Sequence, residues 1–130
     1  GSGNEPIAEA RTVYELMLPR LKGLGHEECW ELLLDRKSRI IKILRTSIGG
    51  SRGTSIDIPA IIRNAMTCSA TAVILVDNHP DGDPRPSAAD IRETSALRDA
   101  CASCSILLLD HIIIADNSFY SFNEEKLHKY

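Results

Sequence analysis

The fold is decided by residues 73–90, which read VILVDNHPDGDPRPSAAD. The segment opens on aliphatic residues without polar alternation, a pattern typical of a central strand covered on both faces. A loop with three prolines follows, and Ser87 then opens a helix that we expect to reach about residue 104. The apolar run over residues 105–115 predicts another strand. This part of the chain is therefore expected to fold as strand, loop, helix and strand.

Further helices and strands are expected on either side of this unit. They are an amphipathic helix over residues 7–22 that kinks or stops at Pro19, a hairpin of strands 29–34 and 40–48 with its turn at 35–38, a helix over 58–68 capped by Asp57, and a short strand over 118–122. Because helices interleave with strands and one strand is buried, the sequence predicts an α/β class with helices packed against a mixed sheet.

Length and composition indicate one globular domain. The chain has 130 residues, of which 43% are hydrophobic and 25% charged, and its formal net charge is -3. We interpret residues 1–6 as an expression scar and tail, and residues 7–130 as a single domain. The mild acidity disfavours a strongly basic nucleic-acid binder, so contact with nucleic acid is expected to be weak or indirect at most. Apolar runs fall far short of the roughly 20 residues that a membrane span needs.

The cysteines and the absence of a secretory leader pattern predict a cytoplasmic protein. The four cysteines show no spacing typical of a disulfide-rich secreted domain, so we expect reduced thiols. The glycine-rich stretch 49–53 resembles a phosphate-binding loop only in its glycine content, since it lacks the Gly-Lys-Ser/Thr ending.

One histidine and two aspartates form a candidate metal site. Asp77 and His79 are two residues apart at a strand end, so their side chains would point to the same side, and Asp90 lies in the first turn of the next helix. One imidazole and two carboxylates suit a divalent metal and leave a position open for water. The alternative is structural, because Ser87 and Asp90 have the spacing of a helix capping box and the other loop aspartates suit turns.

Residues 73–90, with LDHIII at 109–114 and YSF at 120–122, resemble the C-terminal domain of the RadC family, a DNA repair protein family of bacteria. That domain has the JAMM, or MPN, metallopeptidase-like fold, so the resemblance implies a mixed, curved sheet flanked by helices in a cytidine-deaminase-like architecture. The similarity covers about residues 27–122 and includes the motifs HNHPSGDPxPSxxD and DHIII in order. Family members also carry an N-terminal helix-hairpin-helix region that this sequence lacks, so we expect an excised domain or a short member.

The resemblance also implies roles for individual residues. His79 matches the second metal-binding histidine, Asp90 the metal-binding aspartate, and Ser87 the serine that would support a tetrahedral oxyanion. Glu27 matches the glutamate that acts as general acid and base on the metal-bound water, with Glu28 as the adjacent alternative. The implied activity is that of a zinc metallopeptidase, a hydrolase that takes a peptide or isopeptide substrate.

Two positions depart from the family pattern. Asp77 stands where the family has its first histidine ligand, and Asp81 replaces the serine of the HPSG turn. A second carboxylate makes the bound metal less positive, which weakens its activation of water and its preference for zinc over manganese or magnesium. Whether the chain is an active enzyme therefore stays open, with a degenerate, non-catalytic binding module or a DNA-associated accessory domain as the alternatives.

The remaining histidines and the charge pattern complete the hypothesis. His111 lies on an aliphatic strand and is expected to bond to a carbonyl or carboxylate rather than to ligate metal directly. His128 is expected in a polar tail. Residues 77–90 hold four aspartates and one arginine, whereas residues 11–52 hold nine basic and five acidic residues. The loop is therefore acidic, as expected of a segment that binds a cation, whereas the region of the hairpin is basic.

Overall fold

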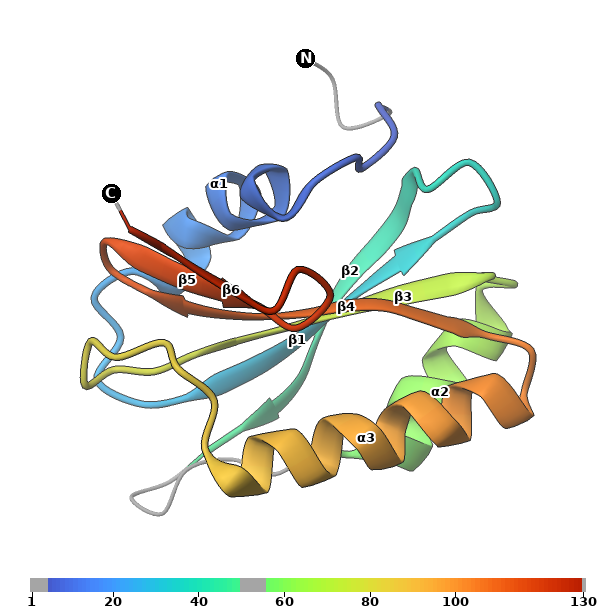
Figure 1. Ribbon diagram of the computed structural model, residues 1–130. Coiled ribbons are helices and arrows are strands. Elements are labelled where there is room, and N and C mark those ends of the chain that lie inside the picture. The colour runs from blue at the N-terminus through green and yellow to red at the C-terminus, as the bar shows by residue number, and fades with distance from the viewer. Residues whose placement is uncertain (1–4, 50–55, 130) are drawn as a thin grey trace.

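Six strands form one mixed sheet in the computed structural model, which describes residues 5–49 and 56–129 (Figure 1). Most of the glycine-rich stretch 49–53 therefore lies outside the described residues. In chain order the elements are α1 (Ala10–Leu21), β1 (Glu28–Leu34), β2 (Ile40–Ile48), α2 (Ile58–Thr67), β3 (Ala72–Asn78), α3 (Ala88–Ser103), β4 (Leu107–Ala115), β5 (Ser118–Ser121) and β6 (Lys126–Lys129).

The strand order is β2-β1-β3-β4-β5-β6, so β3 lies inside the sheet as its unbroken apolar run predicts. β3 and β4 are parallel and are joined by α3, whereas the other neighbouring strands are antiparallel. The crossover begins directly after the polar end of β3, which places the start of α3 near Asp77 and His79. The expected α/β class with a mixed sheet is confirmed.

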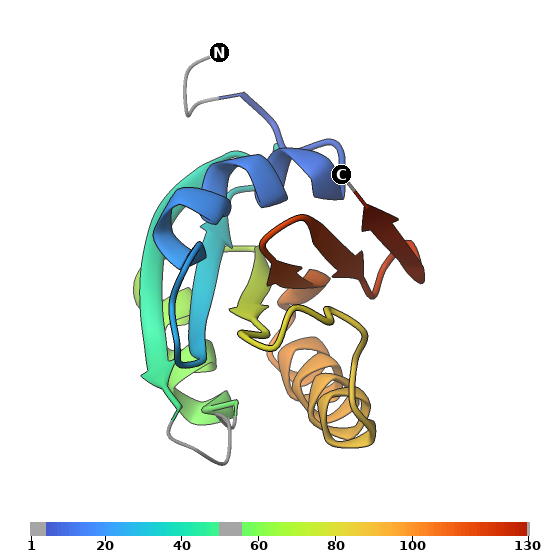
Figure 2. The same ribbon diagram turned by 90° about the vertical axis from the view of Figure 1, so that its left-hand side faces the viewer.

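The helices cover the two faces of a curved sheet (Figure 2). On one face α1 packs on Leu32, Ile74 and Ile112, and on the other α2 and α3 pack on Leu33 and Leu75. All seven residues of β3 are buried, because alternate side chains point into the two cores. In the described part of the chain, no helix is long and apolar enough to cross a bilayer.

Side-chain hydrogen bonds cap the starts of α2 and α3 and close the β1–β2 turn where the sequence predicts. The Ser87 hydroxyl accepts a hydrogen bond from the Asp90 N–H, and the Asp90 carboxylate accepts one from the Ser87 N–H, so the capping box is present in both directions. Asp57 caps α2 by accepting from the N–H of Ala60. Asp35 closes the hairpin turn by accepting from two backbone N–H groups downstream.

Two expectations need correction. α1 begins at Ala10 rather than at Ile7, because the Ile7 N–H is bonded to the Ser38 carbonyl in the hairpin turn. It also continues two residues past Pro19, so the helix does not stop at the proline.

His128 was expected in a polar tail, and that expectation is wrong. It lies in β6, stacks on Phe119 at 4.3 Å between ring centroids, and bonds through Nε2 to Glu124. Backbone pairing with β5 and this ring contact hold a strand that has little apolar pattern of its own.

Glu31 lies fully buried in the middle of β1 and predicts a pH-dependent stability. Its Oε1 accepts from the Asn64 amide, whereas Oε2 has no hydrogen-bond partner among the described residues. Burial raises the pKa of Glu31 to about 7 despite the bond from Asn64. The native state therefore keeps a proton that the unfolded chain loses near pH 4.5.

We expect the free energy of unfolding to fall as the pH rises from about 4.5 to about 7, by up to about 3 kcal/mol, relative to a Glu31→Gln variant that cannot ionise. Urea denaturation of both proteins at a series of pH values measures this difference. Two parallel pH profiles would contradict the assignment.

Candidate metal centre

The pairing of β1 with β3 brings Glu27 next to His79. The two strands are antiparallel with Cys29 opposite Asp77, so the residue before β1 and the residue after β3 come together at the same end of the sheet. Glu27 Oε1 lies 3.9 Å from His79 Nε2. Fifty-two residues of sequence separate the two, and the sheet register alone brings them within reach.

Asn78 fixes this end of the strand pair. It is buried, its Oδ1 accepts from the Glu28 N–H at 2.7 Å, and its Nδ2 donates to the His26 carbonyl at 2.9 Å. Both ends of one amide thus hold the backbone on either side of Glu27. The sequence analysis did not single out Asn78, and its only signal was its position between Asp77 and His79.

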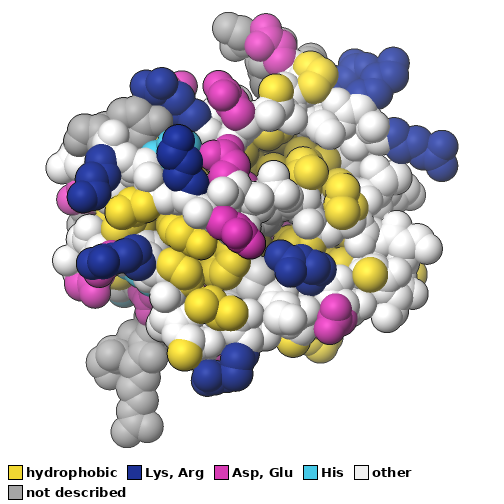
Figure 3. All heavy atoms as spheres, in the orientation of Figure 1, with side chains coloured by type: hydrophobic (Ala, Val, Ile, Leu, Met, Phe, Trp, Pro, Cys, Tyr) yellow, Lys and Arg dark blue, Asp and Glu magenta, His cyan; other side chains and the backbone are white. Residues whose placement is uncertain are grey.

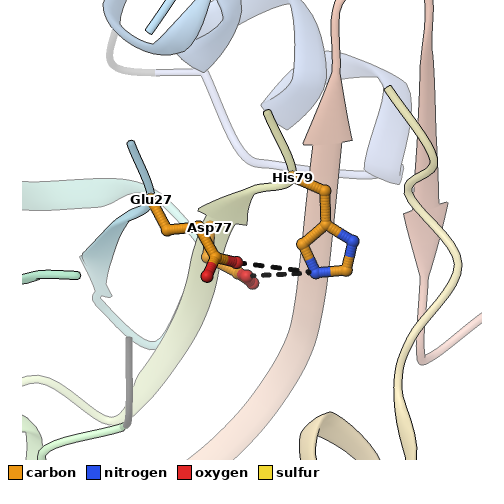
Figure 4. Close-up of side chains that lie close together, drawn as sticks. All are labelled: Glu27, Asp77 and His79. Carbon is orange, nitrogen blue, oxygen red and sulfur yellow. Dashed lines mark ion pairs between the residues drawn. The ribbon is translucent and has the colours of Figure 1, made fainter. Parts of the chain in front are cut away.

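Three carboxylates surround the outer nitrogen of His79, and two of them, those of Glu27 and Asp77, are drawn in Figure 4. Its Nε2 lies 3.4 Å from Asp90 Oδ2, 3.8 Å from Asp77 Oδ2 and 3.9 Å from Glu27 Oε1. Donor atoms of Glu27, Asp77 and His79 all lie within 4.8 Å of one another, whereas Asp90 lies outside that group. The three side chains in Figure 4 converge from two neighbouring strand ends, which is the arrangement that a metal ion requires.

The inner nitrogen of His79 is held by the backbone. Nδ1 lies 2.8 Å from the Asp83 carbonyl, which can only accept, so Nδ1 carries a proton and Nε2 is the atom directed at the carboxylates. Burial lowers the pKa of His79, but the hydrogen bonds to Asp90 and Asp83 and the charges of Asp77 and Asp90 outweigh it and raise the pKa to about 9. The raised pKa favours the protonated form of this ring at neutral pH.

Asp90 serves the helix cap and the cluster with the same oxygen. Its Oδ2 accepts from the Ser87 N–H and also faces His79. Burial raises the pKa of Asp90, yet the hydrogen bonds from His79 and Ser87 lower it to about 2. The capping and metal-site interpretations of Ser87 and Asp90 are therefore compatible, although the capping box is the one that the structure shows directly.

Asp77 faces two histidines. Its Oδ2 is the oxygen near His79, and its Oδ1 lies 2.5 Å from Nε2 of His111 on β4. The expectation that His111 bonds to a carbonyl or carboxylate is confirmed, and the partner is Asp77, the candidate ligand itself, which was not predicted. Thr94 on α3 bonds to the other ring nitrogen of His111 and was also missed.

Glu28 and Asp81 have structural partners outside the cluster. Glu28 accepts from Trp30 Nε1 and bonds to His26, which leaves it directed away from His79. Asp81 accepts from the Asp83 N–H and forms a turn that Gly82 completes with a φ of 90°. The geometry thus places Glu27 rather than Glu28 beside His79, and it gives Asp81 a turn-forming role.

The fold is an α/β domain, and a cluster of acidic and histidine side chains that could hold a metal ion lies at the carboxyl end of β3. Residues 7–127 match the family model described as RadC-like JAB domain, and the chain belongs to this family. Among its curated relatives are UPF0758 proteins, of which the chain spans about half the length. That of Coprothermobacter proteolyticus is 46% identical over 103 residues, 79% of this chain and 44% of the relative.

The UPF0758 protein of Porphyromonas gingivalis is 39% identical over 124 residues, 95% of this chain and 55% of the relative. That of Methanococcoides burtonii is also 39% identical, over 92% of this chain and 52% of the relative. The RadC resemblance and the mixed-sheet architecture expected from the sequence are confirmed.

Proton release on metal binding tests whether His79 is a ligand. Because the pKa of His79 is about 9, a metal that takes Nε2 at pH 7.5 must displace its proton, and we expect about one proton per metal ion. Titration calorimetry in buffers of different ionisation enthalpy measures this number. A His79→Gln variant is expected to release none, and metal binding without proton release in the parent would exclude His79 as a ligand.

Proposed function

We propose that this domain is a metal-dependent hydrolase of metallopeptidase or isopeptidase type. The observation that supports it best is the position of His79 Nε2, which faces three carboxylates at 3.4–3.9 Å while Nδ1 is held by a backbone carbonyl. Metal-binding histidines commonly have this backbone contact on the second nitrogen, because it fixes the tautomer and the ring orientation. Family membership supports a metal site of this kind without identifying the ion.

The donor set suits a divalent cation. His79 and Asp77 would hold the metal, with Asp90 as the third ligand after a small movement toward the group that it borders. Because two of these ligands are carboxylates, manganese or magnesium compete with zinc more strongly than at a site with two histidines. Zinc is our first choice because the imidazole is a nitrogen ligand at a partly buried site.

Glu27 is the proposed general base and acid. When bound, the metal would supply an acidified water and a polarised substrate carbonyl. Glu27 would take the proton from that water, and the same carboxyl would pass it to the departing amine. Its side chain is 22% exposed beside His79, so it can be reached by solvent and by substrate. The Ser87 hydroxyl accepts from Asp90 and keeps its own proton to donate to an oxyanion.

The proposal also covers the class of substrate and the cellular location. A peptide or isopeptide carbonyl suits the site, and the free cysteines suit a reducing, cytoplasmic location. On the face in Figure 3, Lys and Arg side chains are interspersed with acidic and hydrophobic ones. This pattern supports no more than weak or indirect contact with nucleic acid, including any accessory role in DNA repair.

Replacement of the two neighbouring glutamates tests the assignment of the base. We expect Glu27→Gln to reduce turnover of an isopeptide substrate by about 10²–10⁴-fold, because the proton acceptor is lost, while metal still binds. Glu28→Gln is the matched control, and it should keep turnover because Glu28 bonds to His26 and Trp30. Turnover that survives Glu27→Gln, measured at equal metal occupancy, would overturn the role of Glu27.

Replacement of Asp77 by the family histidine separates the enzyme from a degenerate binding module. We expect Asp77→His to raise the affinity for zinc more than that for manganese, because a neutral nitrogen ligand replaces a hard oxygen. Metal analysis of the purified proteins and competition titrations measure both affinities. Stoichiometric metal with turnover in the parent supports the hydrolase, whereas metal only in the variant supports degeneration.

A further inference from the structure

A buried hydrogen-bond chain lies directly behind the candidate metal centre. Thr94 Oγ1 is 2.7 Å from His111 Nδ1, and His111 Nε2 is 2.5 Å from Asp77 Oδ1. The exposed fractions are 2% for Thr94, 1% for His111 and 5% for Asp77. The His111 ring also stacks on Phe122 at 4.7 Å with an interplanar angle of 4°. Packing and hydrogen bonds therefore hold the ring in one orientation.

The order carboxylate, imidazole and hydroxyl is that of a hydrolase triad, but Thr94 cannot be its nucleophile. The Thr94 side chain points from α3 into the interior and is 2% exposed, so a substrate carbonyl has no access to its oxygen. The hydrogen-bond chain must therefore act at its other end, on Asp77, whose Oδ2 faces the cluster.

The proton positions follow from the chemistry of the three groups. An ionised carboxylate only accepts hydrogen bonds, so His111 Nε2 donates to Asp77 Oδ1. The other ring nitrogen, Nδ1, shares a hydrogen bond with the Thr94 hydroxyl, which can act as donor or acceptor. Asp77 Oδ1 is thereby occupied by a donor that the interior holds in place, and Oδ2 is the oxygen left for a cation.

We propose that His111 is a positioning residue that makes Asp77 a one-oxygen metal ligand. The inference rests on the proposed metal-dependent function and extends it to the position where the chain departs from its family. A free aspartate can bind a metal through both oxygens, which would fill the position that a water needs. His111 disfavours this by occupying a lone pair of Oδ1 and fixing the orientation of the carboxylate, and Thr94 and Phe122 hold His111 in place.

Binding of cobalt(II) to the whole chain tests the proposal, because its visible spectrum reports the number and geometry of ligands. We expect His111→Phe, which keeps an aromatic ring but has no donor, to weaken cobalt binding by about 10–100-fold and to change the absorption bands. His111→Gln keeps an N–H donor and should stay within about threefold of the parent with the parent's spectrum. Circular dichroism verifies folding.

His128→Phe is the matched control, because His128 also stacks on a phenylalanine and bonds to a carboxylate, away from the site. It should bind cobalt as the parent does. Where His111→Phe does not fold, Thr94→Val takes its place, and it should weaken binding in the same direction and shift the spectrum.

Three results would overturn the inference while leaving the metal site intact. The first is that His111→Phe, or Thr94→Val where that variant replaces it, keeps the cobalt affinity and the spectrum of the parent. The second is that His111→Gln loses as much cobalt affinity as His111→Phe does. The third is that His128→Phe loses as much. A parent protein that binds no cobalt, zinc or manganese would overturn the proposed function itself, and the inference with it.

Discussion

The amide of Asn78 is the contact on which the candidate site depends. It bonds to backbone on both sides of Glu27 and so fixes the start of β1 against the end of β3. In another register, Glu27, which precedes β1, and His79, which follows β3, would not lie next to each other. Because the Asn78 side chain is buried, the loss of either bond would leave one of its amide groups unpaired as well as a loose strand end.

Asp77 contributes both to the charge of the site and to its connections. Its carboxylate accepts from His111, so a chain of hydrogen bonds reaches from α3 through β4 to the cluster. The same carboxylate adds negative charge beside His79, which contributes to the raised pKa of His79. The aspartates that make this loop acidic thus also raise the pKa of His79.

Much of the fold could be predicted because local signals agree with the tertiary structure. The apolar run of β3, the caps at Asp57 and Ser87, and the turn at Asp35 each have a short-range physical cause. β6 could not be predicted, since its support comes from pairing with β5 and from the stack of His128 on Phe119. Strands of that kind carry almost no sequence signal.

The positions of the candidate site could also be predicted only where the signal lies in a local motif, and not where it depends on the pairing of strands. Spacing and family motifs pointed to Glu27, Asp77, His79, Ser87 and Asp90. The structure brings the carboxylates of Glu27, Asp77 and Asp90 to His79, and Ser87 is bonded to Asp90. Asn78, Thr94 and the partner of His111 depend on which strands are neighbours, which the sequence of one strand does not specify.

The most direct measurement is anomalous diffraction from crystals of the whole chain loaded with zinc, recorded on both sides of the zinc absorption edge. The account predicts one peak at the carboxyl end of β3, bonded to His79 Nε2 and to a single oxygen of Asp77. Zinc-loaded crystals with no peak between these two side chains, or with a metal held without His79, would contradict it.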